Sequence, residues 1–220
     1  MKKNNYYLHI FSAWNREIIT SLVIVLCLVL FILFPVAGAA QNFTRSIFFL
    51  VVVPILYIKF ILRKSLTDFG FSLKNKKEGL YWGGGMLLVS LLAAFLLIKF
   101  TGFKNNYAIP AYALNNFWLF LAYELIFVNI FFVLQEFFFK GFILFSFFER
   151  AGWWSVAISS GIFLLVLAFT GSFVWQLVPM IILSITGSIV AYKSRSWIYS
   201  YLMGLLFLLL TDAYLISIIK

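Results

Sequence analysis

Two residue types that build many catalytic and metal sites are almost missing from this chain of 220 residues. It has one histidine, His9, and one cysteine, Cys27. Zinc sites are built mostly from His and Cys ligands, so a site of that kind cannot be assembled here. A Ser–His or Cys–His nucleophile pair inside the apolar part is also excluded, because His9 precedes the first apolar run. One cysteine forms no disulfide framework, and we expect neither a metal nor another cofactor.

Charge is scarce as well, and hydrophobic residues replace it. Only 11% of the residues are charged and 64% are hydrophobic, whereas soluble domains have about 25% and 45–50%. About 20 consecutive apolar residues cross a bilayer as a helix. The chain is therefore predicted to be an all-α, polytopic transmembrane bundle. The apolar runs predict about seven spans: 18–40, 46–62, 80–100, 116–139, 153–172, 174–192 and 197–218.

The distribution of the basic residues predicts an orientation. With the N-terminus inside, thirteen Lys and Arg residues fall inside and four fall outside, which is the positive-inside pattern of an odd number of spans. The net charge of +10 thus reflects topology rather than nucleic-acid binding. The cluster Lys74, Lys76 and Lys77 is expected to contact anionic lipid headgroups. The expected location is a bacterial cytoplasmic membrane, since richness in Asn, Lys, Ile and Phe is typical of AT-rich bacterial genomes.

Three regions are expected along the chain. Residues 1–17 form an interfacial segment, 18–62 a transmembrane hairpin, and 63–220 one membrane core. The first apolar run is too long and begins too late for a signal peptide, so it is interpreted as a retained anchor. In the basic segment 63–79, Ser65 or Thr67 is expected to cap a short helix. Gly83-Gly84-Gly85 is expected to allow close packing of helices.

Ionisable side chains inside the spans are the candidate functional residues, since they are costly at membrane depth. Glu136 and Lys140 are one helical turn apart and are expected to pair. Helical geometry places Asn129 on the same face, and Glu124 and Gln135 on a second face about 100° away. The polar residues expected inside the spans are Glu124, Asn129, Gln135, Glu136, Lys140, Thr211 and Asp212. These residues alone favour an ion pair that joins helices, and leave open chemistry by Glu124, Glu136 and Asp212.

Residues 65–212 contain several short motifs whose order and spacing can be compared with those of known membrane proteins. The basic stretch LTDFGF at residues 66–71 precedes a Gly-rich span, and QEFFFKGF occupies residues 135–142. SSGIF follows at 159–163, then WQLVP at 175–179 and GSIVAY at 187–192. In this order and spacing the chain resembles the CAAX protease and bacteriocin-processing (CPBP, or Abi) intramembrane proteases. The resemblance implies a CPBP-like membrane core.

The catalytic positions that this resemblance implies have mostly changed. The family motif EExxxR reads Gln135, Glu136 and Lys140 here, so the water-activating glutamate is replaced by a glutamine. The histidine of FxxxH corresponds to Leu167. The histidine and asparagine of the last motif correspond to Gly204 and Leu208. A glutamine amide accepts no proton at neutral pH, and neither leucine nor glycine offers an oxyanion a side-chain donor.

The resemblance therefore implies a kept fold without catalytic groups. We expect a catalytically inactive, CPBP-like integral membrane protein that acts as a binding, scaffold or regulatory subunit beside another membrane protein. A second candidate is an active intramembrane protease that uses Glu136 or Glu124 as an atypical base. A bacteriocin self-immunity protein is a third candidate, and a transporter component with a polar path through Glu124, Glu136 and Asp212 is a fourth.

Overall fold

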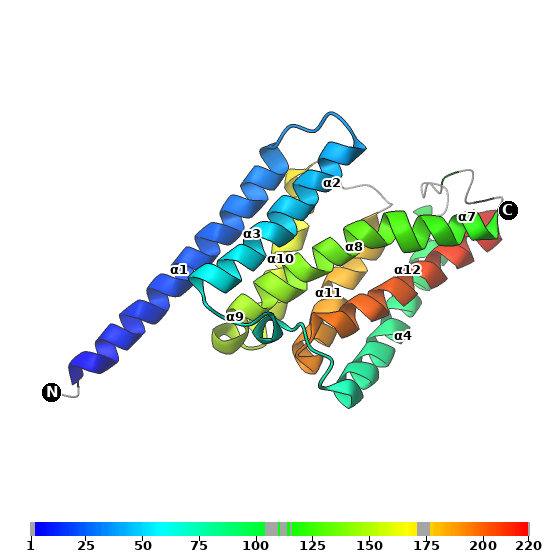
Figure 1. The fold of residues 1–220 in the computed structure, drawn as a ribbon. Coiled ribbons are helices and arrows are strands. Elements are labelled where there is room, and N and C mark those ends of the chain that lie inside the picture. The colour runs from blue at the N-terminus through cyan, green and yellow to red at the C-terminus, as the bar shows by residue number, and fades with distance from the viewer. Residues whose placement is uncertain (1–2, 104–109, 111–113, 115, 171–176, 220) are drawn as a thin grey trace.

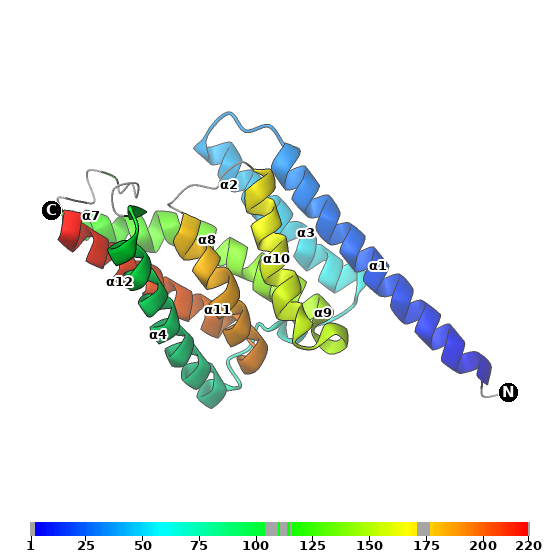
Figure 2. The same ribbon diagram turned by 180° about the vertical axis from the view of Figure 1, so that it is seen from behind.

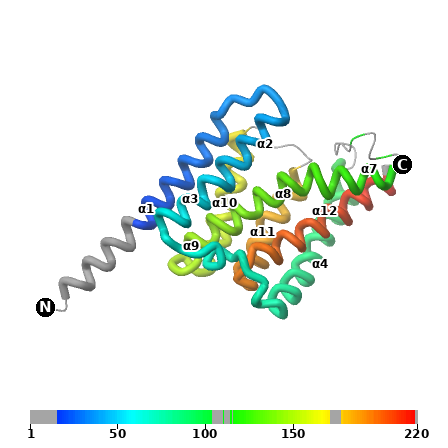
Figure 3. The backbone as a smooth tube through the Cα atoms, in the orientation of Figure 1, coloured from blue at the N-terminus to red at the C-terminus, as the bar shows by residue number. Residues whose placement is uncertain are grey.

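The computed structural model describes residues 3–103, 110, 114, 116–170 and 177–219. These residues form helices joined by short connections, with no β-strand among them (Figures 1 and 3). The all-α fold class is thus confirmed. Two of the described helices, 39–61 and 117–151, alternate between α-helical and π-helical geometry, in which backbone hydrogen bonds reach one residue further along the chain.

Two helices make the hairpin at the N-terminal end. The first, α1 (Lys3–Leu33), is continuous, so that residues 3–17 belong to the same helix as the first apolar run. It ends two residues before Pro35, earlier than the expected boundary at residue 40, because proline disfavours helical geometry in the residue before it. The second helix starts at Ala39 and comprises α2 (Ala39–Ile47), η1 (Phe48–Val52), α3 (Val53–Leu56) and η2 (Tyr57–Ile61).

The connection to the rest of the chain contains the 3-10 helix η3 (Leu66–Phe69), and its cap was predictable. The Ser65 hydroxyl accepts a hydrogen bond from the Thr67 amide, and the Asp68 carboxylate accepts one from the Ser65 amide at 2.9 Å. Gly70 ends the turn at φ 77°, in the left-handed region that glycine adopts without strain. The expected capping by Ser65 is confirmed.

Five apolar helical stretches make up the remainder. Four of them are single α-helices: α4 (Lys76–Phe100), α10 (Trp154–Phe169), α11 (Val178–Ser194) and α12 (Trp197–Ile219). The fifth, called the long helix below, comprises α7 (Phe117–Ala122), η4 (Tyr123–Val128), α8 (Asn129–Glu136), η5 (Phe137–Ile143) and α9 (Leu144–Ala151). The long helix continues past the predicted end of its span at residue 139. Lys140 and Gly141 therefore lie inside a helix rather than at its end.

The long helix lies between two groups of helices. On one side lie α1, the second helix of the hairpin and α10, and on the other lie α4, α11 and α12, which pack against one another (Figures 1 and 2). Phe138 and Phe142 of η5 are fully buried in the core shared with the hairpin and α10. Phe132 of α8 belongs to the second core, together with Leu183 and Phe207. One helix thus carries residues into both cores.

The apolar surface fits a membrane protein. Five helices are long and apolar enough to cross a membrane: Arg16–Leu33, Ala39–Ile61, Lys76–Phe100, Phe117–Ala151 and Trp197–Ile218. Two further apolar helices, α10 and α11, have 16 and 17 residues. Large apolar side chains such as Leu80, Leu88 and Leu92 on α4 are exposed, as is expected of side chains that face lipid.

The glycine run on α4 does not pack as predicted. A Cβ atom added at Gly83, Gly84 or Gly85 would meet no heavy atom within 4 Å. The close approach instead occurs one turn earlier, where a Cβ on Gly79 would lie 2.5 Å from the ring of Tyr199. The prediction of close packing at residues 83–85 was wrong because Gly84 and Gly85 are exposed, and Gly83, although buried, has no neighbouring atom within 4 Å of its Cβ position.

Candidate functional site

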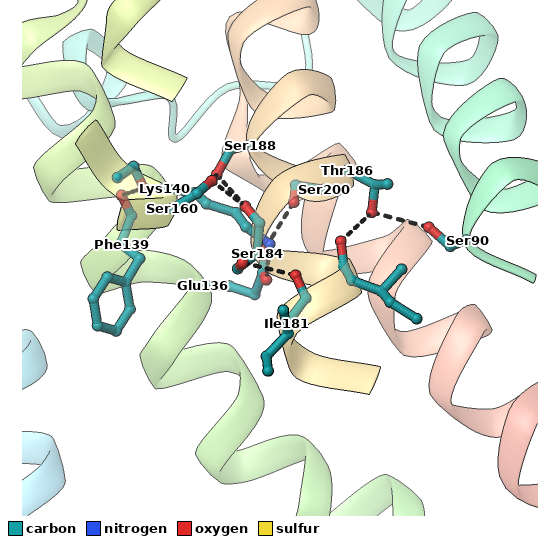
Figure 4. Close-up of polar contacts among 12 residues, drawn as sticks. Ser90, Glu136, Phe139, Lys140, Ser160, Ile181, Ser184, Thr186, Ser188 and Ser200 are labelled. Atoms are coloured by element: carbon teal, nitrogen blue, oxygen red, sulfur yellow. Dashed lines mark hydrogen bonds and ion pairs between the residues drawn. The ribbon is translucent and has the colours of Figure 1, made fainter. Parts of the chain in front are cut away.

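A buried ion pair lies at the centre of the molecule. The Lys140 ammonium donates a hydrogen bond to Glu136 Oε1 one turn away, and both side chains are only 4% exposed (Figure 4). Glu136 ends α8 and Lys140 lies in η5, so the change of helical geometry occurs between the two partners. At this depth each charge offsets the other, which lowers the cost of burying either one.

Two neighbouring helices complete the surroundings of this pair. The Ser200 hydroxyl of α12 donates to Glu136 Oε2 at 2.8 Å, so both carboxylate oxygens accept hydrogen bonds. Gly187 of α11 lies directly against the pair. A Cβ atom there would collide with Lys140 Nζ and lie 2.5 Å from Ser200 Oγ. The pair therefore joins the long helix to α12 and requires a glycine on α11.

A series of hydroxyl groups extends this polar contact across three more helix interfaces. Ser159 of α10 donates to the Phe139 carbonyl at 2.7 Å, and Ser160 donates to the Ser184 carbonyl of α11 at 2.8 Å. On the other side of α11, Ser90 of α4 donates to Thr186 Oγ1 at 2.9 Å (Figure 4). Hydroxyl hydrogen bonds between helices hold membrane bundles together where no hydrophobic force acts between them.

A small cavity adjoins the ion pair. Its volume is about 20 Å³, and its polar lining comes from Gln135, Glu136, Lys140, Ser159, Ser184 and Ser188. That volume holds about one water molecule. A peptide substrate does not fit, and both oxygens of the only carboxylate here already have donors.

The other family-equivalent positions fall in two places. Gln135 and Leu167 line a second cavity of about 260 Å³ between the hairpin, α8 and α10. Gly204 and Leu208 lie instead in the core beside Phe132. A Cβ added at Gly204 would collide with the Phe132 ring, so an aromatic ring fills the place that a side chain at position 204 would need.

The remaining intramembrane polar residues form separate contacts with α12. Asn129 accepts a hydrogen bond from the Tyr201 hydroxyl at 2.8 Å. Glu124 is 1% exposed and is within hydrogen-bonding reach of Asp212, while its Oε2 has no partner among the described residues. Glu124 and Gln135 do not share surroundings, since Gln135 lines the cavities on the other side.

The three carboxyl groups considered for chemistry are not gathered at one site. Glu124 and Asp212 are close together, but Glu136 follows Glu124 by twelve residues on one helix, which is about 18 Å at the α-helical rise. No group of three His, Cys, Asp or Glu side chains among the described residues is arranged to hold a metal ion.

No match to this chain was found among protein-family models, curated proteins or solved structures. The chemistry of the site is therefore inferred from its geometry.

Sequence reasoning missed three contributors to this site: the serines of α10 and α11, Gly187, and Phe132. The spacing of Ser184 and Ser188, four residues apart with Gly187 between them, was the available signal. Small residues at that spacing favour close helix contacts. No sequence signal marked Phe132 among 28 phenylalanines.

Proposed function

We propose that this chain is a catalytically inactive membrane protein with a CPBP-like core, which binds and steadies another membrane protein as a subunit of a complex. One observation carries the proposal: both oxygens of Glu136 accept hydrogen bonds from groups that join helices, Lys140 and Ser200. At the position that the resemblance gives to the catalytic base stands Gln135, whose amide cannot accept a proton at neutral pH. The groups that remain join helices rather than meet a substrate.

The proposed arrangement in the membrane has seven spans, with the N-terminus inside a bacterial cytoplasmic membrane. Support comes from α10 and α11, which are apolar and have 16 and 17 residues, close to the lower limit of a typical span of about 17–25 residues. The charge distribution favours an odd number of crossings. In this arrangement Lys74, Lys76 and Lys77 lie on the inner side next to lipid headgroups; all three are exposed, Lys76 and Lys77 at the start of α4 and Lys74 just before it.

The test is purification of the full chain at native expression in a mild detergent, with mass measurement and identification of bound proteins. We expect one membrane protein at fixed stoichiometry, and the same complex with Glu124→Gln as a matched carboxyl control. A parallel incubation with lipidated and membrane peptides is expected to give no cleavage. A monomer that cleaves such peptides and loses cleavage on Glu136→Gln would establish an active protease instead.

A second candidate, a transporter component, is favoured by the contact between Glu124 and Asp212. Two buried carboxyl groups in hydrogen-bonding contact must share a proton, and intramembrane carboxyl groups often belong to proton paths. Proton flux into liposomes that contain the purified chain decides this candidate. A transporter component is expected to give proton flux that Asp212→Asn and Glu124→Gln each abolish. If no flux is measured, or if neither change affects it, this candidate is rejected.

A further inference from the structure

Arg45 on α2 is a cation in the bundle without an acidic partner. All seven Asp and Glu residues are described, and the three ion pairs among the described residues are Lys64–Glu149, Lys140–Glu136 and Arg150–Glu17. Arg45 takes part in none of them. An arginine in a transmembrane helix is costly unless it is paired or reaches polar surroundings, so its own contacts matter.

Those contacts leave much of the guanidinium unused. Of its five N–H donors, one bonds the Asn42 side-chain oxygen at 2.6 Å and one reaches the Phe34 carbonyl at 3.4 Å. Arg45 Nε is buried and has no hydrogen-bond partner among the described residues. The guanidinium carbon lies 4.5 Å from the centre of the Phe31 ring, which holds the group in place. The fork is positioned, yet several donors remain available.

Arg45 lines the cavity of about 260 Å³ between the hairpin, α8 and α10. Arg45 and Asn42 of α2 and Thr170 at the end of α10 contribute polar groups to its lining, and α2 lies beside this end of α10 (Figures 1 and 2). Further along, the lining is apolar and includes Leu50 and Leu167. The cavity thus has a cationic end and an apolar interior.

We propose that this cavity binds a lipid whose anionic phosphate head is held by Arg45, with part of an acyl chain along Leu50 and Leu167. Charge complementarity selects the head, because a guanidinium fork bonds two phosphate oxygens at once. The apolar lining selects a chain, which a bilayer supplies from every side. The amide of Gln135, which makes no hydrogen bond within the described residues, marks the polar limit at the inner end.

This site is independent of the proposed subunit role. Its arginine belongs to the hairpin 18–62 and has no counterpart among the family motif positions, although Gln135 and Leu167 of its lining belong to the proposed CPBP-like core. A protein that forms no complex would still bind the lipid, and a complex would still form if the lipid did not bind.

The test measures lipid binding to the purified full chain in detergent by native mass spectrometry. Three probes are titrated: phosphatidic acid, diacylglycerol with the same chains, and inorganic phosphate. We expect phosphatidic acid to bind roughly tenfold or more tightly than diacylglycerol, because only the former offers phosphate to the guanidinium. Inorganic phosphate is expected to bind much more weakly than phosphatidic acid, since it gains nothing from the apolar lining.

Variants separate the two ends of the site. Arg45→Gln is expected to reduce phosphatidic acid binding to the level of diacylglycerol, and Arg45→Lys to reduce it less, since lysine keeps the charge without the fork. Lys99→Gln removes an exposed charge from α4 and is the matched control, with no change expected. Leu167→Trp fills the interior and is expected to weaken both lipids.

Three results would overturn the proposal. The first is equal binding of phosphatidic acid to wild type and to folded Arg45→Gln. The second is inorganic phosphate that binds as tightly as phosphatidic acid, which would make the site one for a free anion. The third is equal binding of phosphatidic acid and diacylglycerol to the unmodified chain; this comparison needs no variant and therefore does not depend on how well Arg45→Gln folds.

Discussion

At the scale of single residues, the Glu136 carboxylate is held as a joint between helices. Its two oxygens accept from Lys140 on the same helix and from Ser200 on α12. A buried pair of this kind is not strongly stabilising in itself, but the loss of one partner leaves an uncompensated charge. Removal of one partner alone is therefore expected to lower the free energy of unfolding by more than half of the loss that removal of both partners causes.

The first prediction is a double-mutant cycle at this pair. Glu136→Gln leaves the Lys140 cation buried, and it is expected to lower the free energy of unfolding by about 3–5 kcal/mol. Lys140→Met is expected to cost a similar amount. The double variant should lose clearly less than the sum of the two, because it leaves no unpaired charge. Reversible unfolding in detergent micelles measures all four proteins, and additive losses would show that the side chains do not interact.

The second prediction concerns Gly187. Gly187→Ala places a methyl group against Lys140 Nζ and Ser200 Oγ, and overpacking of this kind costs about 1–3 kcal/mol. Gly161→Ala on α10 is the matched control, since nothing lies within 4 Å of its Cβ position. The control is expected to be neutral or stabilising by up to about 1 kcal/mol. The same unfolding measurement applies, and equal effects at the two glycines would contradict the described packing.

At the scale of helices, the composition predicts the elements well and their faces poorly. Long apolar runs must be helical in a bilayer because each backbone group needs an internal partner, which accounts for the all-α fold. Rotation about each helix axis is different, since apolar residues surround α4 on every side and give no amphipathic signal. For this reason the sequence favoured Gly83–Gly85 as the packing face, whereas Gly79 makes the close contact.

Polar side chains indicate only in part which face of each helix is buried. The sequence places Glu136 and Lys140 one turn apart, but nothing in it indicates that Ser200, sixty-four residues later, donates to Glu136. The change to π-helical geometry at residue 137 also alters the rotation that an α-helical count assumes. Partners on other helices, and the cavities between them, follow from tertiary packing alone.

The third prediction tests the packing face of α4. Gly79→Ala pushes against the Tyr199 ring, whose hydroxyl donates to the Leu73 carbonyl at 2.9 Å, and the loss is expected to be about 1–3 kcal/mol. Gly84→Ala, five residues along the same helix, is expected to stabilise by about 0.5–1 kcal/mol because alanine suits a helix interior better than glycine. Thermal unfolding of the two variants in parallel suffices. A less stable Gly84→Ala would place the packing face elsewhere.

At the scale of the whole molecule, the proposed seven spans fix the side on which each connection lies. The fourth prediction uses single cysteines and a thiol reagent that does not cross membranes. Cys27 is 1% exposed, so an unreactive background is expected without its removal. In intact bacterial cells Gln41→Cys and Thr170→Cys are expected to react, whereas Lys76→Cys and Trp154→Cys should react only after permeabilisation.

The pair at the ends of α10 is the decisive one for the span count. Trp154 begins this helix of 16 residues and Thr170 follows its end, and the two lie on opposite sides only if the helix crosses the bilayer. Labelling of both from the same side would reduce the number of spans, and labelling of Lys76→Cys in intact cells would invert the proposed orientation.

The long helix Phe117–Ala151 has a mechanical consequence. Its 35 residues extend about 50 Å at the α-helical rise, well beyond the hydrocarbon thickness of about 30 Å. Its far end carries Glu149 and Arg150, which pair with Lys64 and Glu17 near the surface. One continuous helix thus carries both these surface pairs and the buried Glu136–Lys140 pair. A displacement of its surface end is therefore expected to move the buried pair directly, without passing through a second helix.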